Sequence, residues 1–207
     1  MEKERFTTLQ STAVPLPVEN IDTDQIIPAR FLKSTTREGF GENLFRDWRY
    51  DGSNQPIQGF VLNDGLFHGK ILVAGKNFGC GSSREHAAWA IYDFGFRAVI
   101  SSFFADIFKS NALNNSLLPV VVSDSFLKQC LEIIQRDPTT KITIDLGAQQ
   151  VKLEGTTEQF DINAYKKECL MNGYDDIDYL LNLREEVREF DLRHPSGVNF
   201  FTKVNRE

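Results

Sequence analysis

The stretch GCGSSREHA at residues 79–87 concentrates two glycines, two serines and an arginine in a span short enough for a single turn. The apolar run KILVAG at residues 70–75 precedes it and is typical of a buried strand. The segment AAWAIY at residues 87–92 has the composition and spacing of a helix. Glycines let the backbone approach a ligand closely, and free amides at a helix N-terminus attract negative charge. The two serines and Arg84 therefore predict a carboxylate held beside a reactive oxygen.

The same turn also allows a purely structural interpretation as a capping box. Ser82 would cap the helix and Glu85, three residues on, would reach back to the cap. Spacing alone does not separate a cap from a catalytic serine, although a second serine and an arginine are more than a cap requires. The turn does not match three other glycine-rich motifs, those of nucleotide hydrolases, dinucleotide-binding proteins and serine hydrolases. It has no Gly-Lys-Ser/Thr, Arg84 replaces the third glycine of the dinucleotide fingerprint, and Ser82 lies outside any Gly-x-Ser-x-Gly elbow.

The overall composition is that of an ordinary globular protein. The residues are 41% hydrophobic and 25% charged. A length of 207 residues suffices for one domain, or for one domain with an appendage. A net charge of −6 argues against a general nucleic-acid binder, which should carry a basic face. No apolar run is long enough to span a bilayer, and residues 1–5 lack the apolar core of a signal peptide. We therefore expect a cytoplasmic protein that binds neither nucleic acid nor membrane.

The cysteines and histidines do not form a metal-binding pattern. Cys80, Cys130 and Cys169 are odd in number and widely separated, which is not typical of a disulfide framework. The chain has no Cys-x-x-Cys, so the usual spacing for an iron–sulfur cluster or structural zinc is missing. We expect that this chain binds no metal and that any metal in its chemistry is held by a different chain.

The rest of the chain predicts alternating strands and helices. Pro15 and Pro17 restrict residues 6–18 to extended or edge-strand structure, and residues 39–50 predict a long loop or short helix. After the turn, strands are predicted at 97–101 and 118–122, helices at 104–115 and 125–135, a hairpin at 141–153, and helices at 164–171 and 177–187. This alternation indicates parallel pairing with helical crossovers. Residues 193–207 show little periodicity and are expected to be mobile or bound by a partner.

Several stretches together resemble the swivelling domain of the aconitase superfamily. Residues 79–87 match its signature, NIDTDQIIP at residues 20–28 looks like its N-terminal motif, and residues 95–100 and 103–111 occupy the expected downstream places. The length and the FRDWRY segment at residues 45–50 make the chain most similar to the bacterial family of 3-isopropylmalate dehydratase small subunits. The resemblance covers nearly the whole chain.

The resemblance implies a fold and a domain organisation. We expect an α/β swivelling domain, with a mixed sheet or partly closed β-barrel flanked by helices. It should be a single domain over residues 1–207, with a core at about 1–160 and a helical C-terminal appendage at about 161–207.

The resemblance also implies a reaction. Enzymes of this family are hydro-lyases of leucine biosynthesis, active only when small and large subunits form a heterodimer or higher assembly. They isomerise 2-isopropylmalate, a dicarboxylate, to 3-isopropylmalate by dehydration and rehydration via 2-isopropylmaleate. In the family, a four-iron–four-sulfur cluster carried by the large subunit binds the substrate, so this chain would hold no cofactor. Two alternatives stay open: the small subunit of a related hydro-lyase of the methylmalate, dimethylmalate or homoaconitate type, and a non-catalytic carboxylate-binding module.

The resemblance assigns roles residue by residue. Ser82 would be the base that removes the proton beside a carboxylate and returns it during hydration. Ser83 and Arg84 would bind and orient a substrate carboxylate. Asp24 matches a polar active-site position of the family, with a turn-forming or supporting aspartate as the alternative.

Other polar residues are expected to be structural or are left unassigned. A structural imidazole is preferred to a proton shuttle for His86, and a packed thiol to a reactive one for Cys80. In citrate-type members of the superfamily an arginine from the region before the turn binds an additional carboxylate. The sequence does not assign that role among Arg30, Arg37, Arg46 and Arg49.

Overall fold

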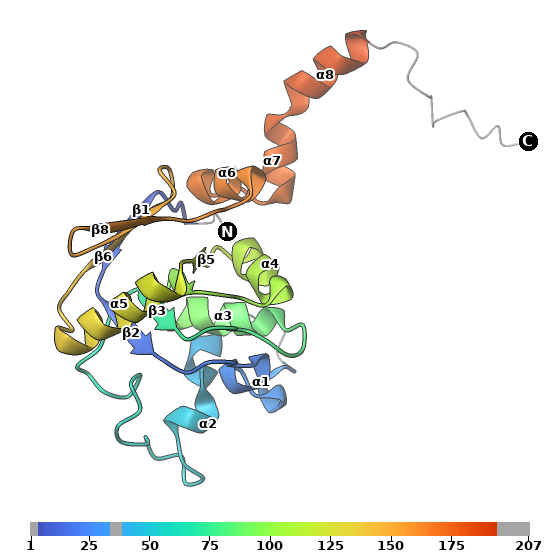
Figure 1. Ribbon diagram of the computed structural model, residues 1–207. Coiled ribbons are helices and arrows are strands. Elements are labelled where there is room, and N and C mark those ends of the chain that lie inside the picture. The colour runs from blue at the N-terminus through green and yellow to red at the C-terminus, as the bar shows by residue number, and fades with distance from the viewer. Residues whose placement is uncertain (1–3, 34–38, 194–207) are drawn as a thin grey trace, which may run out of the picture.

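The computed structural model describes residues 4–33 and 39–193, and within these residues the strands form two four-stranded sheets (Figure 1). One sheet is parallel, with the order β2-β3-β4-β5, and the other is antiparallel, with the order β1-β6-β7-β8. Strand β1 (Thr8–Ser11) leads almost directly into β2 (Ala13–Leu16). A single extended segment therefore connects the two sheets.

The parallel sheet is built from short strands in which every residue except Ser101 is apolar. It comprises β2, β3 (Ile71–Ala74), β4 (Ala98–Ser101) and β5 (Leu118–Val121), with the helices α3 (Glu85–Phe94) and α4 (Asp106–Asn114) as crossovers. All residues of β2, β3 and β4 are buried, as expected for strands covered on both faces. Pro15 and Pro119 lie in the two edge strands, where a missing amide hydrogen is tolerated.

Each face of the parallel sheet packs against a different layer. On one face Ile71 and Val73 join a core formed with α5 (Asp124–Arg136) and the antiparallel sheet. On the other face Leu72 and Ala74 join a core formed with α3, α4 and the N-terminal short helices. The two layers follow from the two-residue side-chain period of a strand.

The short helices before the turn belong to the second layer. They are α1 (Thr23–Ile26), the 3₁₀ helices η1 (Ala29–Phe31) and η2 (Phe40–Asn43), and α2 (Arg46–Arg49). Asp22 caps α1, and its carboxylate accepts a hydrogen bond from the Gln25 amide at 2.8 Å. Asp22 is therefore the N-cap residue of α1.

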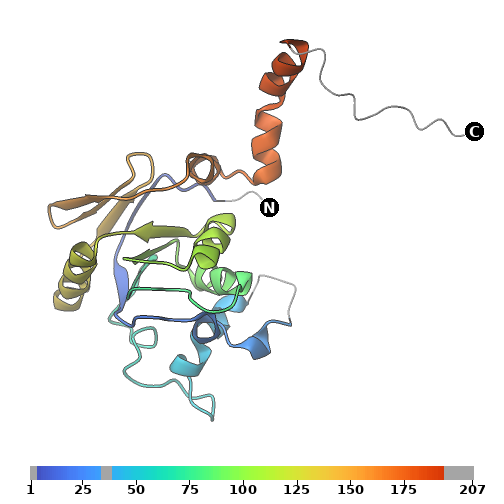
Figure 2. The same cartoon turned by 45° about the vertical axis from the view of Figure 1, so that its right-hand side comes forward.

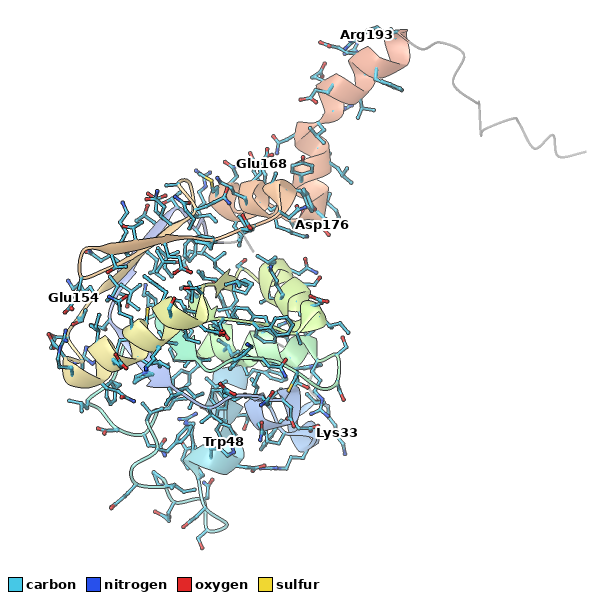
Figure 3. The ribbon with its side chains drawn as sticks, viewed as in Figure 1. Lys33, Trp48, Glu154, Glu168, Asp176 and Arg193 are labelled. Carbon is cyan, nitrogen blue, oxygen red and sulfur yellow. The ribbon has the colours of Figure 1, made fainter. Side chains whose placement is uncertain are left out.

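The antiparallel sheet is half exposed and continues into the C-terminal helices. Its strands β6 (Ile142–Asp145), β7 (Gln150–Leu153) and β8 (Thr156–Gln159) are followed by α6 (Ala164–Asn172), α7 (Asp176–Asn182) and α8 (Arg184–Arg193). Buried positions alternate with half-buried or exposed ones along β6 and β7. Helices α7 and α8 form what we call the C-terminal arm, which projects away from both sheets in Figures 1 and 2. Figure 3 labels Arg193 at the far end of α8.

The predicted α/β class is confirmed, with two differences in detail. Parallel and antiparallel pairs lie in separate sheets rather than in one mixed sheet. The helix predicted at 177–187 is two helices, α7 and α8, which meet at Leu183 (φ −84°, ψ 0°) without a glycine or proline to signal the break. The prediction for residues 193–207 lies, apart from Arg193, outside the described residues. Within residues 4–33 and 39–193, no helix has both the length and the apolarity needed to cross a membrane.

Candidate active site

The turn at residues 79–84 lies at the carboxyl end of the parallel sheet. The chain segments that leave neighbouring strands stay side by side there, since Asp22 forms a parallel bridge with Cys80 and Phe78 forms one with Phe104. Ligand sites in parallel sheets form at this edge, because the loops that follow the strands lie there. The turn is therefore where the fold would be expected to place a site.

Ser82 is not the cap of the following helix. Helix α3 begins at Glu85, its N-cap residue is Arg84, and that residue makes no side-chain capping bond. The Glu85 carboxylate instead accepts hydrogen bonds from Asn115 Nδ2 at 2.9 Å and Trp89 Nε1 at 3.3 Å. The capping-box interpretation of Ser82 and Glu85 is wrong.

The turn requires its two glycines. Gly79 and Gly81 have φ of +75° and +88°, in the left-handed region that favours glycine. A Cβ atom on Gly79 would lie 2.2 Å from Cγ of Phe108 in α4, and one on Gly81 would lie 3.3 Å from Cβ of Asp22. The glycines thus let the backbone pass closely between α4 and the start of α1.

Backbone hydrogen bonds join the turn to the segment that begins α1. The amides of Gly79 and Cys80 donate to the Ile21 carbonyl at 2.8 and 3.2 Å, and the Thr23 amide donates to the Cys80 carbonyl at 2.9 Å. The Thr23 hydroxyl donates to the Ser82 carbonyl at 2.9 Å. The two predicted motifs at residues 20–28 and 79–87 therefore form one structural unit.

The predicted site residues lie in the turn and in the short helix α1 that is hydrogen-bonded to it. Ser82 and Ser83 are exposed, whereas the Arg84 side chain is 14% exposed. Arg84 Nη2 donates to Asp24 Oδ2 at 2.7 Å, Nη1 contacts Asp24 Oδ1, and Nη1 also donates to the Ile27 carbonyl at 3.3 Å. This bidentate ion pair holds the guanidinium in one orientation, in the turn that also carries the two serines.

His86 and Cys80 are half-buried and contact residues around the turn. The His86 ring lies in an aromatic cluster, with its centroid 5.3 Å from that of Phe40 and 4.5 Å from that of Trp89. Cys80 Sγ donates to the Asn20 carbonyl at 3.4 Å.

Comparison with known proteins decides the family. The family model described as the aconitase C-terminal domain matches residues 3–125. The chain is 62% identical over 198 residues to the 3-isopropylmalate dehydratase small subunit of Christiangramia forsetii, covering 95% of this chain and 97% of that protein. It belongs to the 3-isopropylmalate dehydratase small-subunit family. The small subunit of Azobacteroides pseudotrichonymphae is 61% identical over 191 residues, covering 91% of this chain and 97% of that protein.

A solved structure supports the same family and fold. The chain matches the crystal structure of 3-isopropylmalate dehydratase from Methanocaldococcus jannaschii with a TM-score of 0.62 and 26% identity, covering 89% of this chain and 99% of that one. The predicted membership of the small-subunit family and the predicted swivelling-domain fold are confirmed.

The arginines before the turn that the structure describes contact nearby carbonyl, carboxylate and aromatic groups. Buried Arg49 donates through Nη1 to the carbonyls of Gly41 and Leu44, at 3.4 and 3.3 Å, and burial lowers its pKa. Arg30 pairs with Asp47, whereas Arg46 lies over the Tyr50 ring at 3.8 Å. Arg37 lies outside the described residues. Arg49 is thus a structural residue that fixes η2, a role for which the sequence carries no signal.

The cysteines do not fit an iron–sulfur cluster, although membership of the aconitase family implies one for the enzyme. Cys130 is fully buried on α5, and burial raises the pKa of its thiol to about 12, which disfavours the thiolate needed for metal binding. Cys169 is buried on α6, and Cys80 lies in the turn. Among residues 4–33 and 39–193, no three histidine, cysteine, aspartate or glutamate side chains gather as a metal site.

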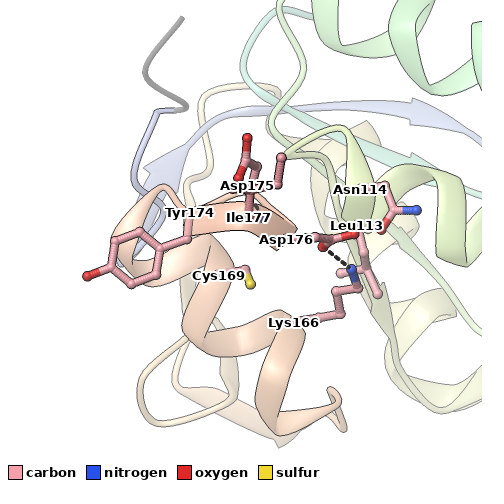
Figure 4. A pocket seen from close by; sticks show the side chains of 8 residues that line it. All are labelled: Leu113, Asn114, Lys166, Cys169, Tyr174, Asp175, Asp176 and Ile177. Carbon is pink, nitrogen blue, oxygen red and sulfur yellow. Dashed lines mark hydrogen bonds and ion pairs between the residues drawn. The ribbon is translucent and has the colours of Figure 1, made fainter. Parts of the chain in front are cut away.

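A cavity of about 380 Å³ lies at the root of the C-terminal arm, lined by residues of α4, α6 and α7 and not by the 79–87 turn. Figure 4 shows Lys166 and Asp176 facing each other there, with Lys166 Nζ 3.2 Å from Asp176 Oδ1. The Tyr165 hydroxyl also donates to Asp176. These contacts link the arm to α6, so we interpret the cavity as a structural junction.

Proposed function

We propose that this chain is the small subunit of a 3-isopropylmalate dehydratase. With a large subunit, as a heterodimer or higher assembly in the cytoplasm, it isomerises 2-isopropylmalate to 3-isopropylmalate by removing water and adding it back. The proposal is supported by exposed Ser82 in the same turn as Arg84, whose guanidinium is held by Asp24, in a chain 62% identical to a small subunit of that name. We assign the iron–sulfur cluster to the large subunit, because the described cysteines of this chain do not form a ligand set.

Ser82 acts as the base in dehydration and as the acid in hydration. Its oxygen takes the proton from the carbon next to a substrate carboxylate, and its hydroxyl returns a proton in the reverse sense. Serine is a poor base in water, so the alkoxide must be stabilised. Arg84 and the N-terminus of the ten-residue helix α3 supply positive electrostatic potential close to Ser82.

Arg84 and Ser83 bind the carboxylate next to the carbon that loses the proton. Deprotonation moves negative charge onto that carboxylate, so a bidentate guanidinium contact becomes stronger as the transition state forms. The Ser83 hydroxyl donates a hydrogen bond to the same group. Substrate binding thereby contributes directly to the reaction rate.

Asp24 acts at the site through Arg84. A carboxylate in direct contact with a dicarboxylate substrate would be repelled, whereas Asp24 already pairs with the Nη1 and Nη2 atoms of Arg84. We therefore assign the substrate to the Nε side of the planar guanidinium fork, which offers a second pair of parallel donors.

The proposal is tested by reconstituting the chain with its cognate large subunit and assaying 2-isopropylmalate against methylmalate, dimethylmalate and homoaconitate. Ser82→Ala should lower kcat by about 10³-fold or more, because it removes the proton-transferring oxygen, while the complex still forms. Ser125→Ala, at an exposed serine of α5 on the other face of the parallel sheet, is the matched control and should change little.

Three results would contradict parts of the proposal. Unchanged turnover in Ser82→Ala would remove Ser82 from the mechanism. A clear preference for an acid without the isopropyl group would reassign the substrate. A complex that forms but turns over none of the four acids would favour a non-catalytic binding module.

A further inference from the structure

Thr23 makes two hydrogen bonds to the turn that carries Ser82. Its side chain is almost fully buried, at 2% exposure. Its amide donates to the Cys80 carbonyl at 2.9 Å, and its hydroxyl donates to the Ser82 carbonyl at 2.9 Å, across 59 residues of sequence. One residue of α1 thus holds the backbone on both sides of Gly81.

The Thr23 hydroxyl is not needed to cap its own helix. Asp22 already caps α1, and its side chain and that of Gln25 form a reciprocal capping box. The Ser82 carbonyl lies two residues before the N-cap of α3, outside the hydrogen-bond pattern of that helix. The Thr23 hydroxyl therefore serves the turn and supplies a donor to this carbonyl.

Ser82 needs such a restraint because Gly81 precedes it. Glycine has more backbone freedom than any other residue, and Gly81 adopts a left-handed φ of +88°. Rotation about Gly81 would swing the Ser82 side chain relative to Arg84. Asp24, the neighbour of Thr23, meanwhile holds the Arg84 guanidinium. Adjacent residues of one short helix thus restrain both Ser82 and Arg84.

We propose that Thr23 is a positioning residue, which fixes the Ser82 oxygen relative to Arg84 by anchoring the Ser82 carbonyl. The inference rests on the proposed function in that it takes Ser82 as the base. Thr23 itself does not touch the substrate. Because proton transfer depends steeply on geometry, loss of the anchor should lower kcat more than it raises KM.

The test compares Thr23→Val with Thr23→Ser in the reconstituted two-subunit enzyme. Valine keeps the shape of threonine but loses the hydroxyl, and serine keeps the hydroxyl. We expect Thr23→Val to lower kcat by about 10- to 100-fold with KM within about threefold, and Thr23→Ser to restore most of kcat. Thr139→Val is the control, since the Thr139 hydroxyl bonds Asp137 in an exposed loop outside the site.

A second measurement is independent of turnover. Amide hydrogen exchange in residues 79–84 should be faster in Thr23→Val than in the wild type and close to the wild type in Thr23→Ser, because the anchor limits local opening. If Thr23→Val does not fold, Thr23→Ala replaces it in both measurements. The kinetics use whichever of the four acids the wild-type complex turns over, and if it turns over none, hydrogen exchange alone decides whether Thr23 anchors the turn.

The outcomes separate this inference from the proposed function. Wild-type kcat or unchanged exchange in a folded Thr23→Val complex overturns the positioning role. Equal loss of kcat in the valine and serine variants also overturns it, because the hydroxyl would then not be the cause. Failure of Thr23→Val to bind the large subunit would indicate a role in assembly and would likewise overturn it. A wild-type complex inactive on 2-isopropylmalate contradicts the proposed function instead.

Discussion

In the parallel sheet every residue of β2, β3 and β4 is buried, whereas in the antiparallel sheet only alternate residues of β6 and β7 are buried and none of β1 or β8 is. The parallel sheet carries the Ser82 turn at its carboxyl end, and the antiparallel sheet leads into α6 and the C-terminal arm. The two sheets meet in a shared core on one face of the parallel sheet.

This difference shows which part of the molecule needs rigidity. A sheet packed on both faces holds its loops in fixed positions, and the turn is further restrained by Gly79, Gly81 and the start of α1. The arm lacks such packing, because no residue of α7 is buried. Substitutions should therefore have very different effects in the two regions.

The largest difference in the free energy of unfolding is expected between a leucine-to-alanine substitution in the parallel sheet and one in the C-terminal arm. Leu72 in β3 is fully buried, whereas Leu181 in α7 is 61% exposed. Leu72→Ala should lower the free energy of unfolding by about 2–5 kcal/mol, because it leaves a cavity in the core. Leu181→Ala should change it by less than about 0.5 kcal/mol. Urea denaturation of both variants measures the difference, and comparable losses would show that the arm is packed in solution.

The sequence predicted well the strands whose burial shows in their composition. The apolar runs that became β3, β4 and β5 and the alternating run of the β6–β7 hairpin were all predicted. Strand β8 was missed because its sequence, TTEQ, has no apolar residue. Its strand structure depends on pairing with β7, which only the folded chain reveals.

The same limit applies to the site. The sequence proposes Ser82, Ser83 and Arg84 as site residues because they are contiguous in one glycine-rich turn that resembles the family signature, and their roles stay predictions. The contacts of Asp24 with Arg84 and of Thr23 with Ser82 span about 60 residues, and neither follows from local spacing. Only the pairing of the segments after β2 and β3 brings these residues together.

Gly79 and Gly155 allow the same substitution, glycine to alanine, to be compared in a tightly packed turn and in an open one. Both have left-handed φ, +75° and +81°, but a Cβ atom on Gly155, in the β7–β8 turn, would have nothing within 4 Å. Gly155→Ala should therefore cost only the backbone strain, about 1–2 kcal/mol. Gly79→Ala adds the collision with Phe108, which should destabilise the fold by a further 1–3 kcal/mol or so. Equal destabilisation in thermal or urea unfolding would mean that Phe108 and α4 can shift away from the turn at little cost in free energy.

The smallest change in the free energy of unfolding is expected when the C-terminal arm is deleted. Deletion of residues 175–207 removes the Lys166–Asp176 pair, whose aspartate is 74% exposed, the hydrogen bond from Tyr165 to Asp176, and the contact between the Tyr165 and Tyr179 rings. An exposed ion pair contributes about 0–1 kcal/mol, so unfolding of the shortened chain should stay cooperative, with a free energy within about 1 kcal/mol of the full chain.

Deletion of residues 161–207 is the informative control for that truncation. It also removes Leu170, which is buried in the core shared by the two sheets, and the carbonyl that accepts from the Phe6 amide at 2.9 Å. Loss of a buried leucine alone is worth about 2–5 kcal/mol, so this shorter chain should be much less stable. A large loss only in the second truncation would place the end of the core after α6. Equal stability of the two would place it near residue 160, as the sequence predicts.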